Sequence, residues 1–369
     1  MRREKILNKI GIITFHRSYN YGSALQAYAL QKYINTHNLG RAEVIDYILK
    51  SNFEQYKLFH FSCYLKNPRW LISDLVYLKR NSRRKRNFEK FVEQYIPLTI
   101  KQYFSSEDMK ELNKQYDIFI CGSDQIWNVE CTNGVEPAYF LEFASNEKRK
   151  MAYAPSIAHL NFSEDVLSKM SAAIEGFKAI SIREESNVEM LSQLTNQKVE
   201  IVLDPTLLLD SKDYEELFSR VHKERYVFVY MLEYNKELVM YAVELAKRAN
   251  LKIYYISKKN EQEYHDALNL YGISPAEFLE YLHDAEYVVT NSFHATVFSA
   301  LFEKKFCTFK TLKSYSRMVD LLTKLGIEDR LYDAKFDISC EINYKVVNKK
   351  LQTLKQSSMS YLERNCLEE

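Results

Sequence analysis

The sequence lacks the features that identify a disulfide scaffold, a zinc protein or a membrane-spanning protein. Six cysteines are scattered over 369 residues, and none of them belongs to a C-x-x-C pair. This spacing indicates neither a disulfide framework nor a zinc site, and it favours a reducing compartment. No apolar run approaches the roughly 20 residues that span a bilayer, and the N-terminus shows no signal-peptide pattern. We therefore expect a cytoplasmic protein without a metal centre.

Charge and glycine patterning argue against two further classes. Lys and Arg number 51 against 49 Asp and Glu, so the formal charge of +2 gives no general reason to expect a nucleic-acid partner. The polar loop at 16–22 lacks the three-glycine fingerprint of dinucleotide-binding proteins. The sequence therefore gives poor support to NAD binding.

Apolar, strand-like runs alternate with helical patterns along most of the chain. In the first half, a helical pattern covers 23–34 and the runs lie at 9–15, 42–47, 116–122, 151–156, 179–184 and 199–203. A second set has a helical pattern at 236–249 and runs at 226–231, 252–256 and 287–290. This order predicts an α/β protein with two Rossmann-like domains that face a central cleft and carry ligand loops at the strand carboxyl ends.

The predicted domains cover 1–210 and 211–342. The first contains an aromatic, basic and helical insertion at 50–100. A polar helix predicted at 343–369 is expected to pack back on the first domain. Hydrophobic residues make up 46% of the chain, which is ample for two cores.

The most informative stretch is the turn that follows the run at 287–290. Asn291, Ser292, Phe293 and His294 lead directly into an apolar helical pattern. The first N–H groups of a helix have no intrahelical partner, and the helix dipole adds partial positive charge there. A histidine on the turn adds a proton and another donor. The pattern predicts a phosphate or carboxylate site.

A second polar turn follows the run at 116–122, and its motif is GSDQIWN. Asp124 is a carboxylate at a strand end, and Trp127 lies three residues further on. A sugar site uses a carboxylate for hydroxyls and an indole for the face of a pyranose ring. The alternative is an Asx-turn in which Asp124 only shapes the loop.

These motifs, with others at strand ends, resemble the polysaccharide pyruvyltransferase family. The resemblance is carried in order by HRSYNYGSALQAYAL, YDIFICGSDQIWN, AYAPSIA, ISIREES, LDPTLLLD and SPAEFLEYLHDAEYVVTNSFHATVFSALF. It implies a two-domain fold similar to the GT-B glycosyltransferases. It also implies transfer of a pyruvyl group from phosphoenolpyruvate to two hydroxyls of a sugar, which gives a cyclic ketal and phosphate. Neither a redox cofactor nor a metal is needed for this reaction.

The resemblance also implies roles for individual residues. His294 matches the family's donor-site histidine and is the expected proton donor, with Asp124 as the second catalytic residue. The family often has Arg-x-His-Gly here, so Ser292 replaces an arginine, and Asn291 or Ser292 is expected to supply part of its contact. The expected donor-binding residues are His294, Arg183, Arg317, Asn291 and Ser292. From the side chains that they offer, the expected acceptor-binding residues are Tyr19, Asn20, Tyr21, Gly22, Ser123, Asp124, Gln125 and Trp127. Cleft closure is the alternative for the loop of Tyr19, Asn20, Tyr21 and Gly22.

Two of the donor-binding assignments have competing interpretations. Arg183 could instead form a salt bridge with Glu184 or Glu185. Arg317 competes with Lys313, and either could be an exposed surface charge. Arginine suits phosphoenolpyruvate because its planar fork binds phosphate and carboxylate groups in a bidentate manner.

A cluster of basic residues at 79–86 has apolar neighbours on both sides. The flanking residues are Trp70, Leu71, Leu75, Leu78, Phe88 and Phe91. Such a segment can lie on an anionic membrane surface, where a polyprenyl-pyrophosphate-linked sugar would be a natural acceptor. The alternative is a solvated helix face.

Two other functions remain compatible with the sequence because fold does not determine function. One is a nucleotide-sugar glycosyltransferase on the same scaffold. The other is a glycan-binding relative without catalytic activity, which the serine at position 292 would permit. The donor that is consumed distinguishes the three functions.

Overall fold

The computed structural model describes residues 7–49, 57–59, 61–64, 67, 69–158, 162–258, 263–264, 267–311, 315–333 and 336–367. The chain divides into two compact units. Unit 1 comprises Met1–Gln55, Val92–Leu209 and Gln352–Glu369, and unit 2 comprises Tyr56–Phe91 and Asp210–Leu351. Among the described residues, no helix combines the length and apolar character that crossing a bilayer requires.

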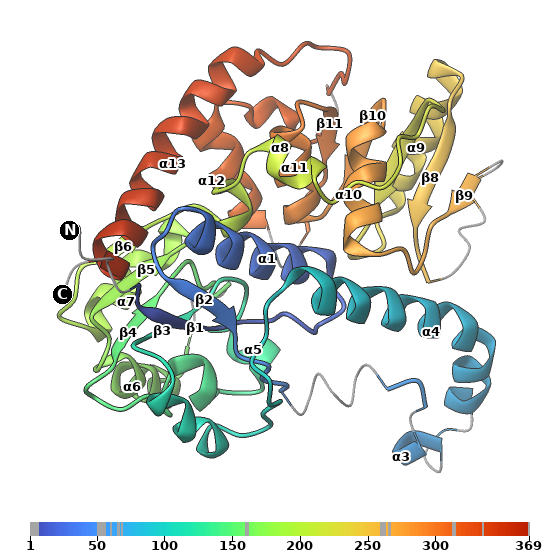
Figure 1. Ribbon diagram of the computed structural model, residues 1–369. Helices are drawn as coiled ribbons and strands as arrows, with labels where there is room; N and C mark the ends of the chain where they lie inside the picture. The colour runs from blue at the N-terminus through green and yellow to red at the C-terminus, as the bar shows by residue number, and fades with distance from the viewer. Residues whose placement is uncertain are drawn as a thin grey trace, which may run out of the picture. The chain divides into compact units, whose positions relative to one another are not determined.

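Unit 1 is built on a six-stranded parallel sheet (Figure 1). In spatial order its strands are β2 (Arg41–Val44), β1 (Lys9–Ile13), β3 (Ile118–Cys121), β4 (Arg149–Ala152), β5 (Ala179–Ile182) and β6 (Val199–Ile201). Its helices and 3₁₀ turns are α1 (Tyr21–Thr36), η1 (Glu107–Lys114), α5 (Val129–Thr132), η2 (Pro137–Phe140), α6 (Glu164–Ile174), η3 (Glu185–Asn187), α7 (Val188–Leu194) and η4 (Pro205–Leu207). The helix α13 (Tyr344–Leu367) ends in this unit.

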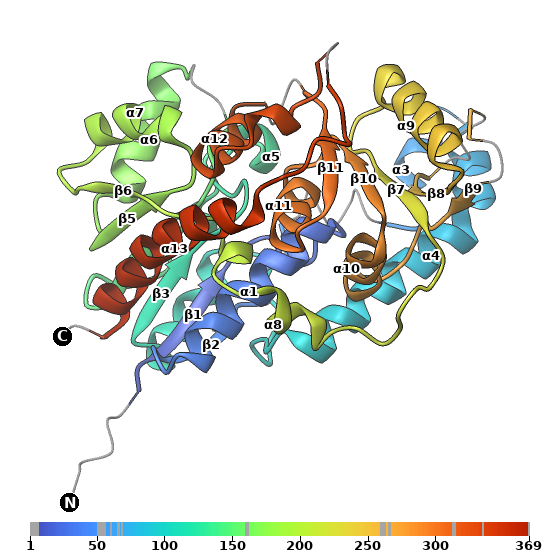
Figure 2. The same cartoon turned by 90° about the horizontal axis from the view of Figure 1, so that it is seen from above.

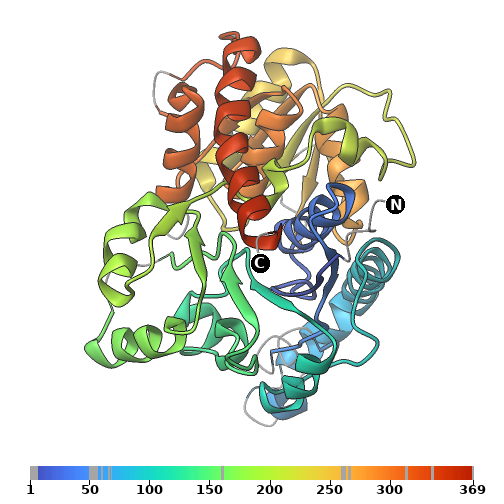
Figure 3. The ribbon, with the colours of Figure 1, turned by 60° about the vertical axis from the view of Figure 1, so that its left-hand side comes forward.

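Successive strand residues point to opposite faces of a sheet, so each strand supplies side chains to both faces. Different elements cover the two faces of the first sheet. Phe119 and Cys121 belong to one core cluster with Met170 and Ile174 of α6. On the other side, Tyr361 of α13 donates a hydrogen bond to the carbonyl of Ala152 at 2.8 Å. Figure 3 shows the last turns of α13 beside this sheet.

Unit 2 contains a five-stranded parallel sheet. Its strands, in spatial order, are β11 (Lys305–Thr308), β10 (Tyr287–Thr290), β7 (Tyr226–Tyr230), β8 (Lys252–Ile256) and β9 (Ala267–Asn269). Its helices are α3 (Phe61–Tyr64), α4 (Arg69–Tyr95, which continues into unit 1), α8 (Ser211–Glu215), α9 (Lys236–Ala249), α10 (Pro275–Asp284), α11 (Phe293–Leu301) and α12 (Tyr315–Leu325), with the 3₁₀ turn η5 (Glu328–Arg330).

Helices cover both faces of the second sheet. Val227 and Val229 of β7 pack in one cluster with Leu238 of α9. The alternate strand residues Phe228 and Tyr230 contact Phe278 of α10. Figure 2 shows α9 and α10 on opposite sides of these strands. Two parallel, doubly covered sheets confirm the predicted α/β fold class with two Rossmann-like domains.

The compact units differ from the predicted domain map in two places. The smaller is the start of the C-terminal helix, because unit 2 extends to Leu351. The larger is the predicted insertion. The sequence analysis assigned 50–100 to the first domain, whereas Tyr56–Phe91 belongs to unit 2. The physical reason is that α4 is held by that unit. Arg80 donates to the carbonyl of Lys258 at 3.0 Å, and Asn87 donates to the carbonyl of Gly272 at 2.7 Å.

Candidate functional site

The predicted anion-binding turn lies at the carboxyl end of β10 in unit 2. Ser292 is the N-cap of α11, and its hydroxyl accepts a hydrogen bond from the N–H of Ala295 at 3.4 Å. Asn291 has another function, because its amide binds the backbone of the loop after β7. Its oxygen accepts from the N–H of Leu232 at 2.8 Å, and its nitrogen donates to the carbonyl of Glu233 at 2.7 Å. Asn291 therefore ties the ends of two neighbouring strands together.

A histidine and an arginine lie around the start of α11. His294 is half-buried in the first turn of the helix. Arg317 projects from α12, is buried, and its guanidinium lies 5.6 Å from the ring centroid of Phe293. The rings of Phe293 and His294 are 5.2 Å apart between centroids. Phe293, the first residue of α11, thus lies close to both the imidazole and the guanidinium. These two groups at a helix N-terminus are a chemically suitable environment for an anion. Lys313, the alternative to Arg317, lies outside the described residues.

The other predicted group lies at the carboxyl edge of the sheet in unit 1. Asn20 is the N-cap of α1, and its side-chain oxygen accepts from the N–H of Gly22 at 2.9 Å. Tyr21 and Gly22 are buried in the first turn of this helix, whereas Tyr19 is half-buried before it with a positive φ of 43°. The loop therefore exposes Tyr19 and Asn20 more than the two residues that follow them.

Asp124 is buried at the same edge, and it is held by its neighbours. The hydroxyl of Ser23 donates a short hydrogen bond to its carboxylate. The N–H of Gln125 donates to Oδ1 of Asp124 at 2.8 Å. Gln26 fixes the adjacent residue by accepting from the N–H of Ser123 at 3.1 Å. These contacts show that Asp124 shapes its loop, and its catalytic role stays a prediction.

The prediction that Trp127 stacks on a sugar is wrong. Its side chain is 0% exposed and lies in the core of unit 1. The indole stacks on Phe140 with ring centroids 5.0 Å apart and meets the edge of Phe177 at 6.0 Å. Its N–H donates to the carbonyl of Tyr139 at 3.1 Å. An indole enclosed in this way offers no ring face to a ligand.

Trp127→Phe should therefore affect stability and leave acceptor use unchanged. The variant keeps an aromatic ring in the core. It removes the N–H that donates to the Tyr139 carbonyl, and the smaller ring leaves a small void. We expect the free energy of unfolding to fall by about 1–3 kcal/mol, measured by urea denaturation. A rise in KM for the acceptor at unchanged stability would restore the sugar-stacking interpretation.

Arg183 lies at the centre of a buried ion-pair cluster at the carboxyl ends of β5 and β6. Its guanidinium donates a short hydrogen bond to Asp204, and its Nε is 3.6 Å from Oε1 of Glu184. Ser156 in turn donates to Glu184. Burial alone would lower the pKa of Arg183, but the charges of Asp204, Glu184 and Asp124 outweigh burial and raise that pKa.

This cluster contains the salt bridge that the sequence analysis gave as the alternative to donor binding by Arg183. Glu184 is one of the two partners that were considered, whereas Asp204 was missed. The signal for Asp204 was present, because the Asp-Pro-Thr turn directly follows a predicted strand. Asp204 is itself oriented, since its Oδ1 accepts from the N–H of Thr206 at 3.0 Å. The donor-binding role of Arg183 stays a prediction.

A second carboxylate network at this edge was not anticipated from the sequence. Asp46 follows β2, and its Oδ1 lies 3.0 Å from Nε2 of His16 and 2.7 Å from Nε of Arg17. Burial alone would raise the pKa of Asp46, but hydrogen bonds and charge from His16 and Arg17 lower it below the usual range. The network fixes the beginning of the loop that carries Tyr19 and Asn20.

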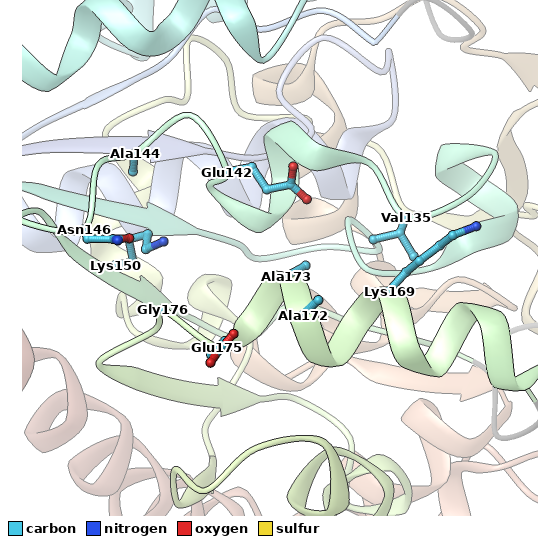
Figure 4. A pocket seen from close by; sticks show the side chains of 10 residues that line it. All are labelled: Val135, Glu142, Ala144, Asn146, Lys150, Lys169, Ala172, Ala173, Glu175 and Gly176. Atoms are coloured by element: carbon cyan, nitrogen blue, oxygen red, sulfur yellow. The ribbon is translucent and has the colours of Figure 1, made fainter.

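One cavity of unit 1 lies away from all of these residues. It has a volume of about 890 Å³ and is lined by Val135, Glu142, Ala144, Asn146, Lys150, Lys169, Ala172, Ala173, Glu175 and Gly176 (Figure 4). Lys150 is near the start of β4 and Gly176 precedes β5, so this cavity is at the amino edge of the sheet. The predicted site residues are at the carboxyl edge.

The chain is similar to one protein family and to several solved structures. The family model described as polysaccharide pyruvyl transferase matches residues 20–311. Among solved structures, the UDP-GlcNAc 2-epimerase from Neisseria meningitidis bound to UDP-GlcNAc is similar at 10% identity and a TM-score of 0.48, over 98% of this chain and 94% of that chain. The Arabidopsis thaliana protein UGT89C1 complexed with quercetin is similar at 12% identity and a TM-score of 0.45, over 97% and 94%. No curated protein sequence matches the chain.

Proposed function

Because the chain belongs to the polysaccharide pyruvyl transferase family, we propose that it transfers the pyruvyl group of phosphoenolpyruvate to two hydroxyls of a sugar. The products are a cyclic ketal on a cell-surface or capsular polysaccharide precursor and inorganic phosphate. The observation that carries the proposal is the group formed by His294, Arg317 and the N-terminus of α11. These groups match the charges of a donor that bears both a phosphate and a carboxylate.

The reaction requires one proton to be delivered to carbon and two to leave oxygens. Protonation of C3 of phosphoenolpyruvate makes C2 electrophilic, and a sugar hydroxyl then attacks C2 and loses its proton. The C2–O bond to phosphate breaks, phosphate leaves with the electron pair, and the second hydroxyl closes the ring and loses its proton. A positioned general acid and a general base accelerate such steps.

We assign the roles by residue type and position. His294 donates the proton to C3, and Arg317 binds the donor as a planar cation. The N–H groups at the start of α11 bind phosphate oxygens. Asp124 and the loop of Tyr19 and Asn20 are assigned to acceptor hydroxyls. The assignment includes no metal and no cofactor, so a chelator should leave turnover unchanged.

The test is incubation of the protein with phosphoenolpyruvate and candidate glycans, both soluble and linked to polyprenyl pyrophosphate. Mass spectrometry should detect a pyruvyl ketal on the glycan, with equal release of phosphate. Release of a nucleotide from a sugar nucleotide would instead identify a glycosyltransferase. Glycan binding without consumption of either donor would identify a binding protein that has lost catalysis.

A further inference from the structure

The helix α4 has two sides with different environments. One side is held by unit 2. Arg84 donates to the hydroxyl of Tyr271 at 3.3 Å, and that hydroxyl donates to Asn81 at 3.2 Å. Arg80 and Asn87 bind backbone carbonyls on the same side. The basic cluster predicted from the sequence is therefore divided, because Arg80 and Arg84 serve the packing of the protein.

A neighbouring side of α4 is exposed and carries further basic charge, and its Arg83 borders the packed side, with its Cγ close to Gly272. Lys79, Arg83, Arg86 and Lys90 are all exposed. Their spacing of four, three and four residues places them on one side of a helix, since residues three and four apart are neighbours. This basic side contrasts with the packed side, where the arginines are engaged by Lys258 and Tyr271.

The turns that precede the basic side expose apolar residues. Ile72 is 63% exposed, Leu75 is 56% exposed and Val76 is 66% exposed. Val76 lies three residues before Lys79, so these two side chains are neighbours on the helix surface. The exposed apolar residues and the basic residues therefore form one continuous stripe. Phe61 of the nearby helix α3 is 72% exposed. Isolated exposed apolar residues are ordinary, but several adjacent to a basic stripe indicate a contact surface.

We propose that this side of α4 docks on an anionic lipid surface. The charges of Lys79, Arg83, Arg86 and Lys90 would attract anionic headgroups, and Ile72, Leu75 and Val76 would enter the boundary of the acyl region. A second copy of the chain fits poorly, because pairing this side with itself would bring like charges together. A nucleic acid would leave the apolar residues in water. The surface shares no residue with the site proposed for pyruvyl transfer, and the inference does not depend on that function.

Two sets of variants test the proposal by co-sedimentation with vesicles. The charge variant combines Lys79→Gln, Arg83→Gln, Arg86→Gln and Lys90→Gln. Its matched control removes four exposed lysines from other elements, by Lys198→Gln, Lys212→Gln, Lys247→Gln and Lys345→Gln. The apolar variant combines Ile72→Ser and Val76→Ser, and its matched control combines Val221→Ser and Met240→Ser, which are 77% and 62% exposed in the native protein.

The native protein should bind vesicles of phosphatidylcholine with phosphatidylglycerol, and binding should weaken with salt. The charge variant should bind about 100-fold to 1000-fold more weakly. Each basic residue near an anionic surface makes a similar contribution to the binding free energy, and the variant removes four of them. The apolar variant should bind more weakly at every salt concentration, and both controls should bind like the native protein. Turnover on a soluble acceptor should be the same in the charge variant and its control.

Three results would overturn the proposal. One is that the native protein stays in solution with anionic vesicles. Another is that the matched control of the charge variant loses binding as strongly as the charge variant. Vesicle binding would then depend on the net charge of the protein and not on this side of α4. The third is that duplex DNA displaces the protein from vesicles and binds the apolar variant as tightly as the native protein, which would identify a nucleic-acid surface.

Discussion

Replacing His294 with alanine is expected to abolish phosphate release from phosphoenolpyruvate while the protein stays folded. In the proposed mechanism this imidazole donates the proton to C3, and positioned proton donors typically accelerate a reaction about 10²-fold to 10⁴-fold. Loss of a charged contact to the donor would add about 2–5 kcal/mol to the transition-state barrier. The side chain is half-buried in the first turn of α11, so its removal leaves the helix cap at Ser292 in place. Phosphate release under steady-state conditions measures the effect.

Two comparisons separate catalysis by His294 from general damage. His294→Gln retains a polar side chain that cannot deliver a proton in the same way, so it should keep donor binding better than turnover. His37→Ala removes an exposed histidine at the end of α1 and should leave turnover unchanged. Turnover of His294→Ala close to that of the native protein would remove this residue from the mechanism.

Replacing Arg183 with methionine is expected to destabilise unit 1 strongly. Asp204 and Glu184 would remain buried after their guanidinium had been removed. Breaking a buried ion pair by removing one partner typically costs about 3–5 kcal/mol of unfolding free energy. Urea denaturation of the native protein and the variant measures this loss. Asp204→Asn should recover part of it in the Arg183→Met background, because the second substitution removes a buried negative charge.

A matched exposed pair provides the control for this stability effect. Nε of Arg225 is 3.2 Å from Oε2 of Glu286, and the two side chains are 67% and 32% exposed. Arg225→Met should change stability little, because exposed ion pairs are screened by water and salt. If Arg183→Met proved as stable as Arg225→Met while losing phosphate release, the donor-binding prediction for Arg183 would hold and the structural interpretation would fail.

Local sequence patterns were sufficient for most of the secondary structure. The apolar runs at 252–256 and 287–290 coincide with β8 and β10, and the helical pattern at 236–249 coincides with α9. Strand β9 was not predicted, because Ala267–Asn269 is short and has no buried apolar run. The predicted helix start after the turn at 291–294 was found because its signal lies within four residues of sequence.

Contacts between residues that are distant in the sequence were much harder to predict. Trp127 lies three residues after Asp124 near a strand end, so it was interpreted as the indole of a sugar site that also uses the carboxylate. Its enclosure depends on Phe140 and Phe177, which come from other elements of unit 1. Arg183 pairs with Asp204 because β5 and β6 are adjacent parallel strands, whose carboxyl ends lie together. The order of strands in the sheet cannot be inferred from the two turns alone.

The sequence by itself determined the α/β class, the strand and helix segments, the family and the polar turns at strand ends. These properties depend on periodicity and on motifs within a few residues, which do not require knowledge of distant partners. Only the tertiary structure decided that Trp127 is a core residue, that Arg183 is engaged by Asp204, and that α4 directs Arg84 inward and Arg86 outward. Each of these outcomes is set by what packs against the side chain, and burial decides whether the same residue stabilises the fold or meets a ligand.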